Sequence, residues 1–236
     1  MHIQKVILRQ MKMTLKAPFT TSFGSMNERK FILAEVRDRE GRSGWGECVA
    51  FDAPWYTEET TQTCWSIMEN FLIPRIIGKE IVHPSELNDA FKPVKRNFMA
   101  KSAIEGAVWD LYVKQRGQSL KACLGGKKDR IEVGLSIGIQ ESIPRLLEVI
   151  EKGLSDGYKR IKVKMKPGYG VELLREIRRY YPDIPLMADA NSAYRLSDID
   201  TLRRMDEFGL TMIEQPLAAD DIIDHAALQE QMKTPI

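Results

Sequence analysis

The sequence has few cysteines, and they form no recognisable pattern. Its 236 residues include three, Cys48, Cys64 and Cys123, with no C-x-x-C spacing among them. Disulfide scaffolds carry even sets of cysteines in oxidising compartments, and structural zinc sites need closely spaced ligands. The odd, scattered set therefore argues against both, and we expect buried, inert thiols in a reducing compartment.

Long apolar runs and an excess of one charge are also missing. No run approaches the roughly 20 residues of a membrane span, and the N-terminus lacks a signal-peptide core. The net charge is only +2, with both signs interspersed. Such a chain has no electrostatic reason to bind nucleic acid or an acidic membrane. With 43% hydrophobic residues for a core, we expect a cytoplasmic protein whose partner is a small molecule.

A short basic strand organises the second half of the chain. Residues 160–166 alternate apolar and basic residues before a Pro-Gly break, which predicts a β-strand with Lys162 and Lys164 on one face. Alternating lysines are usually a solvated strand face. Here, however, Asp189 and Glu214 each close a later apolar run, at successive intervals of 25 residues from Lys164.

An interval of 25 residues is about the length of one strand-helix unit. Three consecutive parallel strands would then present Lys164, Asp189 and Glu214 at the same C-terminal edge. In β/α barrels this edge carries the catalytic residues, while the opposite end mostly serves stability. The spacing therefore predicts an active site there.

The first half of the chain predicts a small α+β unit. Alternating apolar residues indicate an antiparallel meander of three strands, at residues 2–16, 31–37 and 44–49. Residues 17–25 and 51–56 are predicted as loops. Three helices are predicted: one from the N-cap Thr57 to about Leu72, one starting at Ser85, and one over residues 99–114 that Gly117 ends. Trp109 and Asp110, on the third helix, are interpreted as structural.

From Ile131 onward, strands and helices alternate, which indicates a parallel sheet with right-handed crossovers. The strands are predicted at residues 133–139, 161–165, 184–188 and 210–213, and Thr234–Ile236 opens a fifth. The helices are predicted at residues 142–154, 171–181, 197–208 and 220–232. A Gly-rich polar turn at residues 125–130 is the best boundary, so we expect domains of residues 1–126 and 127–236.

Motifs spread over the whole chain together carry a resemblance to a known family. They are Pro18-Phe19 with Phe23-Gly24, Gly44-Trp45-Gly46-Glu47, Pro54 to Thr60, Met99-Ala100-Lys101, Trp109-Asp110-Leu111, Lys162-x-Lys164, Asp189-Ala190-Asn191 and Glu214-Gln215-Pro216. Jointly they resemble the enolase superfamily, in its muconate-lactonising subgroup, and within it the o-succinylbenzoate synthases and N-acylamino-acid racemases. The resemblance implies an α/β fold: an α+β capping domain followed by the first half of a modified, TIM-like β/α barrel.

The resemblance also implies a metal site and a base. A divalent cation, Mg²⁺ or another such as Mn²⁺, would be held by carboxylates, of which Asp189 and Glu214 match the first two; Asn191 would support them from behind. Lys164 matches the general base and Lys162 the lysine behind it. The third metal ligand and an opposing lysine would lie beyond Ile236. Oxygen ligands suit a hard cation, which can stabilise an enediolate.

Six residues are expected to line the substrate side of the cavity. Five come from the two loops of the first half and one from the first barrel strand: Phe19, Thr20, Ser22, Phe23, Trp55 and Ser136. We expect the loops to set specificity for a small-molecule carboxylate. We also expect a homo-oligomer for the full-length protein.

The activity implied by the resemblance is that of an o-succinylbenzoate synthase, a lyase of menaquinone biosynthesis that abstracts an α-proton and then eliminates water. The alternative within the enzyme class is racemisation of N-acylamino acids by 1,1-proton transfer, because both reactions use the same base, metal and enediolate. Dipeptide epimerisation and muconate cycloisomerisation rank lower. A hypothesis of another class is an inactive, truncated fragment that folds, if at all, by pairing with itself or with a complementary half.

Overall fold

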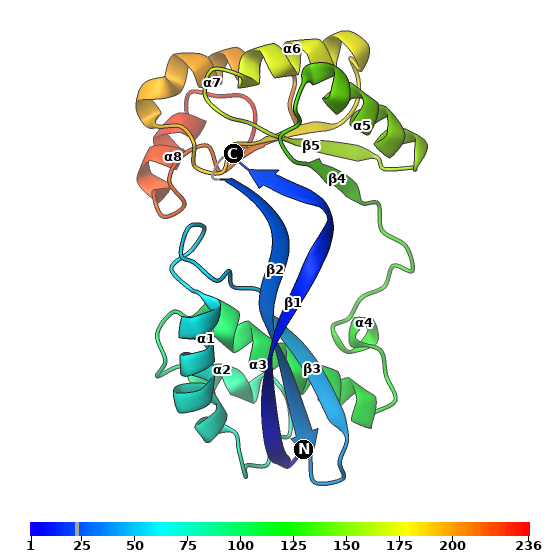
Figure 1. Cartoon of the computed structure of the whole chain (residues 1–236), viewed down its shortest axis with the longest axis vertical. Coiled ribbons are helices and arrows are strands. Elements are labelled where there is room, and N and C mark those ends of the chain that lie inside the picture. The colour runs from blue at the N-terminus through cyan, green and yellow to red at the C-terminus, as the bar shows by residue number, and fades with distance from the viewer. Residues whose placement is uncertain (22–23) are drawn as a thin grey trace. The chain divides into compact units, whose positions relative to one another are not determined.

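The chain folds into two compact units, each with its own sheet and core. The structure, a computed structural model, describes residues 1–21 and 24–236. The first unit contains residues 1–17 and 27–129, and the second contains residues 18–26 and 130–236. One sheet is antiparallel and the other parallel, which confirms the predicted fold class (Figure 1). Among the described residues, no helix combines the length and apolar character needed to cross a membrane.

The sheet of the first unit has the order β1-β2-β3, with β1 at Ile3–Thr21, β2 at Gly24–Asp38 and β3 at Ser43–Cys48. Both long strands extend beyond their predicted ends, so the predicted loop is wrong over residues 17–21 and 24–25. Aromatic and β-branched residues such as Phe19 and Thr20 favour extended backbone. The carbonyl of Thr20 also accepts a hydrogen bond from the backbone N–H of Ile139, at 3.3 Å within the second unit.

The first unit also contains helices, the longest of which packs on β3. They are α1 (Thr61–Ile67), which continues as a π-helical turn (Met68–Leu72) and a 3₁₀ turn (Ile73–Arg75), then α2 (Glu86–Phe91), α3 (Phe98–Gln115) and the short α4 (Leu120–Cys123). The predicted second and third helices are confirmed. Gly117, with φ +59°, follows α3 in the left-handed conformation that glycine adopts easily.

The first helix begins later than predicted, because nearby Glu59 serves another helix. Thr60, and not Thr57, is the N-cap: its hydroxyl accepts from the Thr63 N–H at 3.2 Å, and the Thr63 hydroxyl accepts from the Thr60 N–H at 2.9 Å. The buried carboxylate of Glu59 instead accepts hydrogen bonds from the backbone N–H groups of Met99 and Ala100 at the start of α3. The first N–H groups of a helix have no acceptor within the helix, and this carboxylate supplies one.

Helix α3 lies unusually close to β3. A Cβ atom built on Gly46 would stand 2.0 Å from the carbonyl oxygen of Ala103, and one on Gly44 would stand 2.1 Å from that of Ala107. The Asp110 carboxylate accepts the backbone N–H of Trp45 at 2.8 Å, which confirms its structural interpretation. The two glycines of Gly44-Trp45-Gly46 therefore allow the backbones of β3 and α3 to pack in direct contact.

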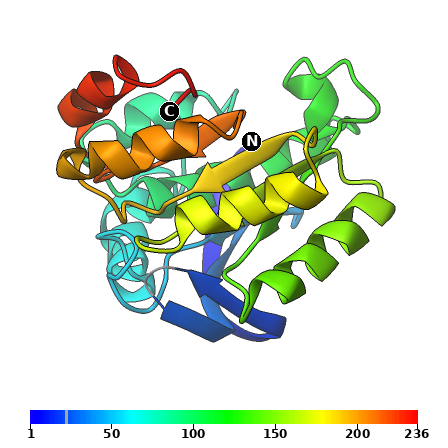
Figure 2. The same ribbon diagram turned by 90° about the horizontal axis from the view of Figure 1, so that it is seen from above.

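The second unit carries the parallel sheet, in the order β4-β5-β6-β7. These strands span Gly134–Ile137, Arg160–Lys164, Leu186–Asp189 and Met212–Glu214. The helices are α5 (Ile143–Ser155), α6 (Gly170–Tyr180), α7 (Ile199–Asp206), which follows a 3₁₀ turn (Leu196–Asp198), and α8 (Ile222–Gln229). Figure 2 shows α5, α6 and α7 side by side along the sheet, in yellow-green, yellow and orange.

The core of this unit lies between the sheet and its helices. Ile161, Val163, Leu186, Ala188 and Ile213 are at most 1% exposed and belong to one apolar cluster with helix residues. The strand residues between them therefore face the other side. The Ile213 N–H donates to the Pro235 carbonyl at 2.9 Å, so the end of the chain runs beside β7, where a fifth strand was predicted.

A buried acid in the first unit was not predicted from the sequence. Glu35 is 1% exposed, and its carboxylate contacts Arg37 at 2.6 Å, Ser43 at 2.6 Å and Arg9 at 2.7 Å. The hydrogen bond from Arg37 is the main cause that lowers the pKa of Glu35 to about 2, with Ser43 and Arg9 adding to it and burial opposing it. The acid is thus ionised and lies between two guanidinium groups, which compensate its buried charge.

Gly46→Ala should strongly destabilise the first unit, whereas Gly106→Ala should not. The added methyl group at Gly46 meets helix backbone, which cannot move aside, so we expect a loss of about 3 kcal/mol or more. At Gly106, within α3, the nearest atom is 3.9 Å away, and alanine should gain about 0.5–1 kcal/mol in helix propensity. Urea unfolding followed by tryptophan fluorescence reports this unit, since Trp45, Trp55, Trp65 and Trp109 all lie in it. Equal stabilities of the two variants would contradict the packing argument.

Glu35→Gln should lower the free energy of unfolding by on the order of 3 kcal/mol at pH 7. Because folding lowers the pKa of Glu35, its contribution is fully present above the ordinary glutamate pKa and is lost as the pH falls towards about 2. The variant and the wild type should therefore converge near pH 2. Glu28→Gln, which breaks the exposed ion pair with Lys12, is the control and should cost about 0.5 kcal/mol or less.

Candidate active site

Three predicted residues meet at the C-terminal edge of the parallel sheet. The strand register pairs Lys164 with Asp189, and Asp189 with Glu214, so the three stand in one row across β5, β6 and β7. Since Ile161 and Val163 face the helices, Lys162 and Lys164 face the opposite side. We call Lys162, Lys164, Asp189, Asn191 and Glu214 the strand-end site.

Lys164 is the most enclosed lysine of this site. Its side chain is 8% exposed, and its ammonium donates to Asp189 Oδ2 at 2.6 Å and to Asn191 Oδ1 at 2.7 Å. The second oxygen of Asp189 accepts the backbone N–H of Asn191 at 3.1 Å. Asp189 and Asn191 together therefore fix the position of the Lys164 amine.

Lys162 starts one layer deeper than Lys164 but reaches the same level. Its backbone pairs with Met187 in β6, two residues before Asp189. Its ammonium nevertheless contacts Asp189 Oδ2 at 3.1 Å and Glu214 Oε2 at 2.8 Å. The expectation that Lys162 stays deeper therefore holds for its backbone and is wrong for its charged end, because a lysine side chain is longer than the step between layers.

The carboxylates keep Lys162 charged. Burial acts to lower the pKa of Lys162, but the hydrogen bonds and charges of Glu214 and Asp189 outweigh it, so the pKa lies above the ordinary value. A lysine must lose its proton to act as a base. In this arrangement the Lys162 ammonium is paired with both Glu214 and Asp189.

The loops that follow β6 and β7 hold strained backbone next to the site. Asn191, Ser192 and Gln215 have φ angles of +45°, +61° and +47°. Non-glycine residues in this region cost free energy and persist only where the surroundings hold them. Only the asparagine gave a signal in the sequence, since Asn tolerates this conformation; nothing in the sequence marked Ser192 or Gln215.

The donor set at the strand ends suits a hard divalent cation. The carboxylates of Asp189 and Glu214 both contact the Lys162 ammonium, so they point at one position that attracts positive charge. Oxygen ligands are the type that Mg²⁺ and Mn²⁺ prefer. Within residues 1–21 and 24–236, no three acidic, histidine or cysteine side chains form a metal-binding cluster. The described residues therefore offer two carboxylates for a cation, those of Asp189 and Glu214.

Two further residues lie near this row, of which Ser136 was predicted to contact substrate. Ser136 in β4 pairs with Lys162 in the register, on the same face but one layer below Lys164, and its side chain is exposed. Lys166 lies beyond the end of β5, is exposed and has its amine 5.8 Å from the centre of the Tyr169 ring. Lys166 has therefore left the strand, which ends at Lys164.

The predicted substrate-binding residues are only partly placed. Thr20, at the end of β1, contacts Ile139 just after β4, and its hydroxyl lies 2.9 Å from that of Ser25; Phe19 beside it is 39% exposed. Ser22 and Phe23 lie outside the described residues. Trp55 belongs to the first unit, where its ring stacks on Phe51 with centroids 4.4 Å apart. The binding roles of all six residues stay predictions.

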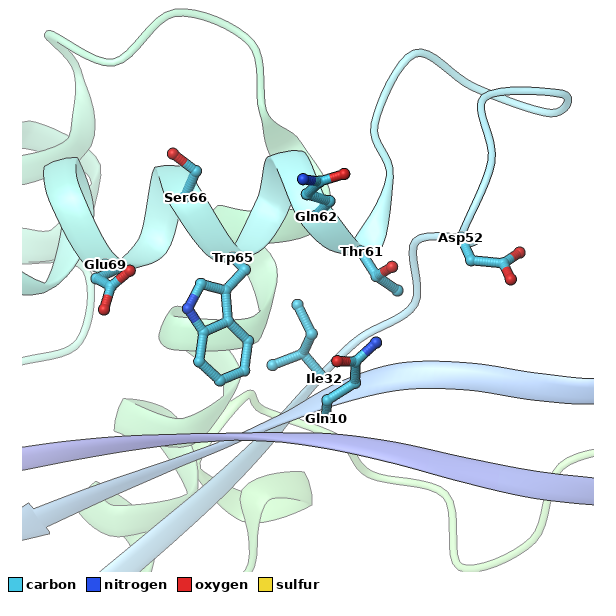
Figure 3. Close-up of a pocket in the computed structure, with 8 residues that line it drawn as sticks. All are labelled: Gln10, Ile32, Asp52, Thr61, Gln62, Trp65, Ser66 and Glu69. Atoms are coloured by element: carbon cyan, nitrogen blue, oxygen red, sulfur yellow. The ribbon is translucent and has the colours of Figure 1, made fainter.

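A separate pocket lies in the first unit, between β1, β2 and α1. Its volume is about 460 Å³. The Trp65 side chain points into the pocket beside Ile32, and Glu69 and Asp52 lie at opposite ends (Figure 3). Asp52 is already paired with Lys30 at 2.8 Å. No predicted site residue lines this pocket, and its acids do not face each other as a proton-transfer pair would.

Two family profiles match the chain, one on each half. The profile described as "Mandelate racemase / muconate lactonizing enzyme, N-terminal domain" matches residues 3–125. The profile described as "Enolase C-terminal domain-like" matches residues 145–236. Together they cover the first unit up to residue 125 and, in the second unit, β5, β6 and β7 with the strand-end site.

Named relatives match along the whole chain. The o-succinylbenzoate synthase of Geobacillus stearothermophilus is 58% identical over 235 residues, which are 100% of this chain and 63% of the relative. The N-succinylamino acid racemase of Thermus thermophilus is 43% identical over 100% of this chain and 64% of the relative. The chain thus spans somewhat less than two thirds of the length of these relatives.

Solved structures match equally well. A member of the enolase superfamily from Listeria innocua has a TM-score of 0.94 at 39% identity, over 99% of this chain and 63% of that one. A dipeptide epimerase from Enterococcus faecalis, complexed with Mg and the dipeptide L-Leu-L-Tyr, has a TM-score of 0.87 at 25% identity, over 99% and 66%. The predicted resemblance is confirmed: the chain belongs to the enolase superfamily, in the group of mandelate racemase and muconate lactonizing enzyme.

Proposed function

We propose that this chain carries the base and two metal ligands of an o-succinylbenzoate synthase, a lyase that removes a proton next to a carboxylate and then eliminates water. The row of Lys164, Asp189 and Glu214 across three neighbouring strands is the observation that carries the proposal. The relative that is 58% identical over 235 residues and bears this name supports it.

Asp189 and Glu214 would hold a divalent cation, Mg²⁺ or Mn²⁺. The dipeptide epimerase of the same superfamily, which is complexed with Mg, supports this choice. Such a cation neutralises the negative charge that develops on a substrate carboxylate when the neighbouring carbon loses its proton. The two acids come from strands in register, so their positions are fixed by the sheet rather than by a loop.

Lys164 is the proposed base. Its amine is held by Asp189 and Asn191 at the open end of the strand row, so a substrate carbon placed there would face it. After accepting the α-proton, Lys164 is an ammonium and can donate to the departing hydroxide, which leaves as water. Lys162 holds positive charge beside Asp189 and Glu214 and so orients both acids.

Racemisation of N-acylamino acids is the second candidate. The relative named N-succinylamino acid racemase, 43% identical, favours it. Both reactions begin with removal of an α-proton, so the strand-end site serves either one, and groups that contact the rest of the substrate must discriminate. Substrate contacts at Phe19, Thr20, Trp55 and Ser136, a homo-oligomeric assembly and a cytoplasmic location remain predictions.

Lys164→Ala should abolish exchange of the substrate α-proton with solvent deuterium, with metal still bound. The expected loss is at least about 10³-fold, since a positioned general base typically contributes 10²–10⁴-fold. Lys166→Ala is the matched control, because Lys166 is two residues further along the chain but exposed beyond the strand, and it should keep the exchange rate. Exchange retained in Lys164→Ala and lost in Lys162→Ala would reverse the two assignments.

Asp189→Asn and Glu214→Gln should each weaken binding of Mn²⁺, measured by electron paramagnetic resonance of the free ion. Each change turns a carboxylate into a neutral amide, which removes a unit of negative charge and one of the two oxygen donors, so we expect at least about a tenfold weaker affinity. Glu207→Gln, an exposed acid just after α7, is the control. Undiminished affinity in both site variants would rule out the ligand role.

A further inference from the structure

The loop that follows β7 is bonded through its backbone to the loop that follows β6. The N–H groups of Ala190, Ser192 and Tyr194 donate to the carbonyls of Glu214, Gln215 and Pro216, at 3.0, 2.7 and 3.0 Å. These three bonds run in sequence order, so they extend the pairing of β6 and β7 beyond the strands. In all three bonds the carbonyls belong to the loop after β7, and none of the bonds uses an N–H group of that loop.

In the loop after β7, the first backbone N–H beyond Gln215 is that of Leu217, because proline at position 216 has none. Leu217 is 2% exposed, so its N–H cannot rely on water. A buried backbone donor without an acceptor is costly and rare. Its acceptor is not a backbone carbonyl but the Nε2 atom of His225, at 3.3 Å.

The other ring nitrogen fixes the protonation state of His225. Nδ1 lies 2.5 Å from the carbonyl oxygen of Asp221, which can only accept a hydrogen bond. Nε2 must in turn accept from Leu217. Both bonds are made only by a neutral imidazole that carries its proton on Nδ1.

Helix α8 makes this arrangement rigid. The Asp221 side chain caps the helix by accepting from the Asp224 N–H at 2.9 Å, so the carbonyl that receives Nδ1–H belongs to a fixed first turn. Leu217 itself packs in the same apolar cluster as Leu228 of α8. The imidazole therefore joins the loop to the helix that follows it.

We propose that His225 is a positioning residue of the strand-end site: as the Nδ1–H tautomer it anchors the loop that begins with Glu214. The loop is then held on two sides, by the β6 loop through its carbonyls and by His225 through the Leu217 N–H. This restraint keeps Gln215 at φ +47° and so fixes the direction in which Glu214 leaves the sheet. That Glu214 binds metal rests on the proposed function; the anchoring of the loop does not.

The tautomer itself gives the first test, on the ¹⁵N-labelled chain at neutral pH. Long-range ¹⁵N–¹H spectra should show His225 with a protonated Nδ1 and an unprotonated Nε2. A protonated Nε2 would overturn the proposal, because that nitrogen could not accept from Leu217. This measurement needs no variant.

Two variants test the anchor. His225→Phe removes both bonds, and hydrogen exchange of the Leu217 amide should accelerate about fivefold or more relative to amides of α6. His225→Gln offers one acceptor and one donor at similar reach and should restore most of the protection. Equal exchange in wild type and His225→Phe, or no rescue by Gln, would contradict the anchor.

Mn²⁺ affinity separates this proposal from the proposed function. If His225 positions Glu214, His225→Phe should weaken Mn²⁺ binding several-fold while His225→Gln retains it. Faster exchange at Leu217 with unchanged Mn²⁺ affinity would overturn the positioning role. If Glu214→Gln also leaves Mn²⁺ affinity unchanged, the proposed metal site itself fails.

Discussion

The strand-end site depends on one oxygen atom, Oδ2 of Asp189, at which two lysine ammonium groups meet. Lys164 contacts it at 2.6 Å and Lys162 at 3.1 Å, while Asp189 is 1% exposed. A carboxylate this deeply buried is unstable without paired charge, and removing one partner of such a group typically costs about 3–5 kcal/mol. The pairing therefore fixes both amines and the acid together, and the parallel register of three strands places them in one row.

Backbone hydrogen bonds between neighbouring loops help to hold this row in place. The loops after β6 and β7 are joined by successive hydrogen bonds, and three of their residues adopt left-handed backbone angles. Strain of this kind is typical of sites whose geometry is fixed before substrate arrives. The first unit shows the same reliance on backbone: Gly46 lets α3 touch β3, and Glu59 caps α3 in place of the helix next to it.

The sequence was informative where local pattern alone decides structure. Period-two alternation put Lys162 and Lys164 on one face, and equal spacing put Lys164, Asp189 and Glu214 on successive strands; both statements follow from strand geometry and needed no knowledge of contacts. The helix that starts after Ser85 and the end of α3 before Gly117 were equally local. Predictions failed where two local solutions competed, as at Thr57 and Thr60, since the choice depended on Glu59 being needed by a distant helix.

The sequence by itself thus determined which residues share the C-terminal edge of the parallel sheet and at which level of the sheet their backbones lie. Only the tertiary structure decided where the side chains end: that Lys162 reaches Glu214, that Glu35 is buried among two arginines, and that His225 accepts from Leu217. The reason is physical. Backbone period and strand length are fixed by neighbours in the chain, whereas a long side chain or a buried charge takes its position from partners that the fold brings together from far along the sequence.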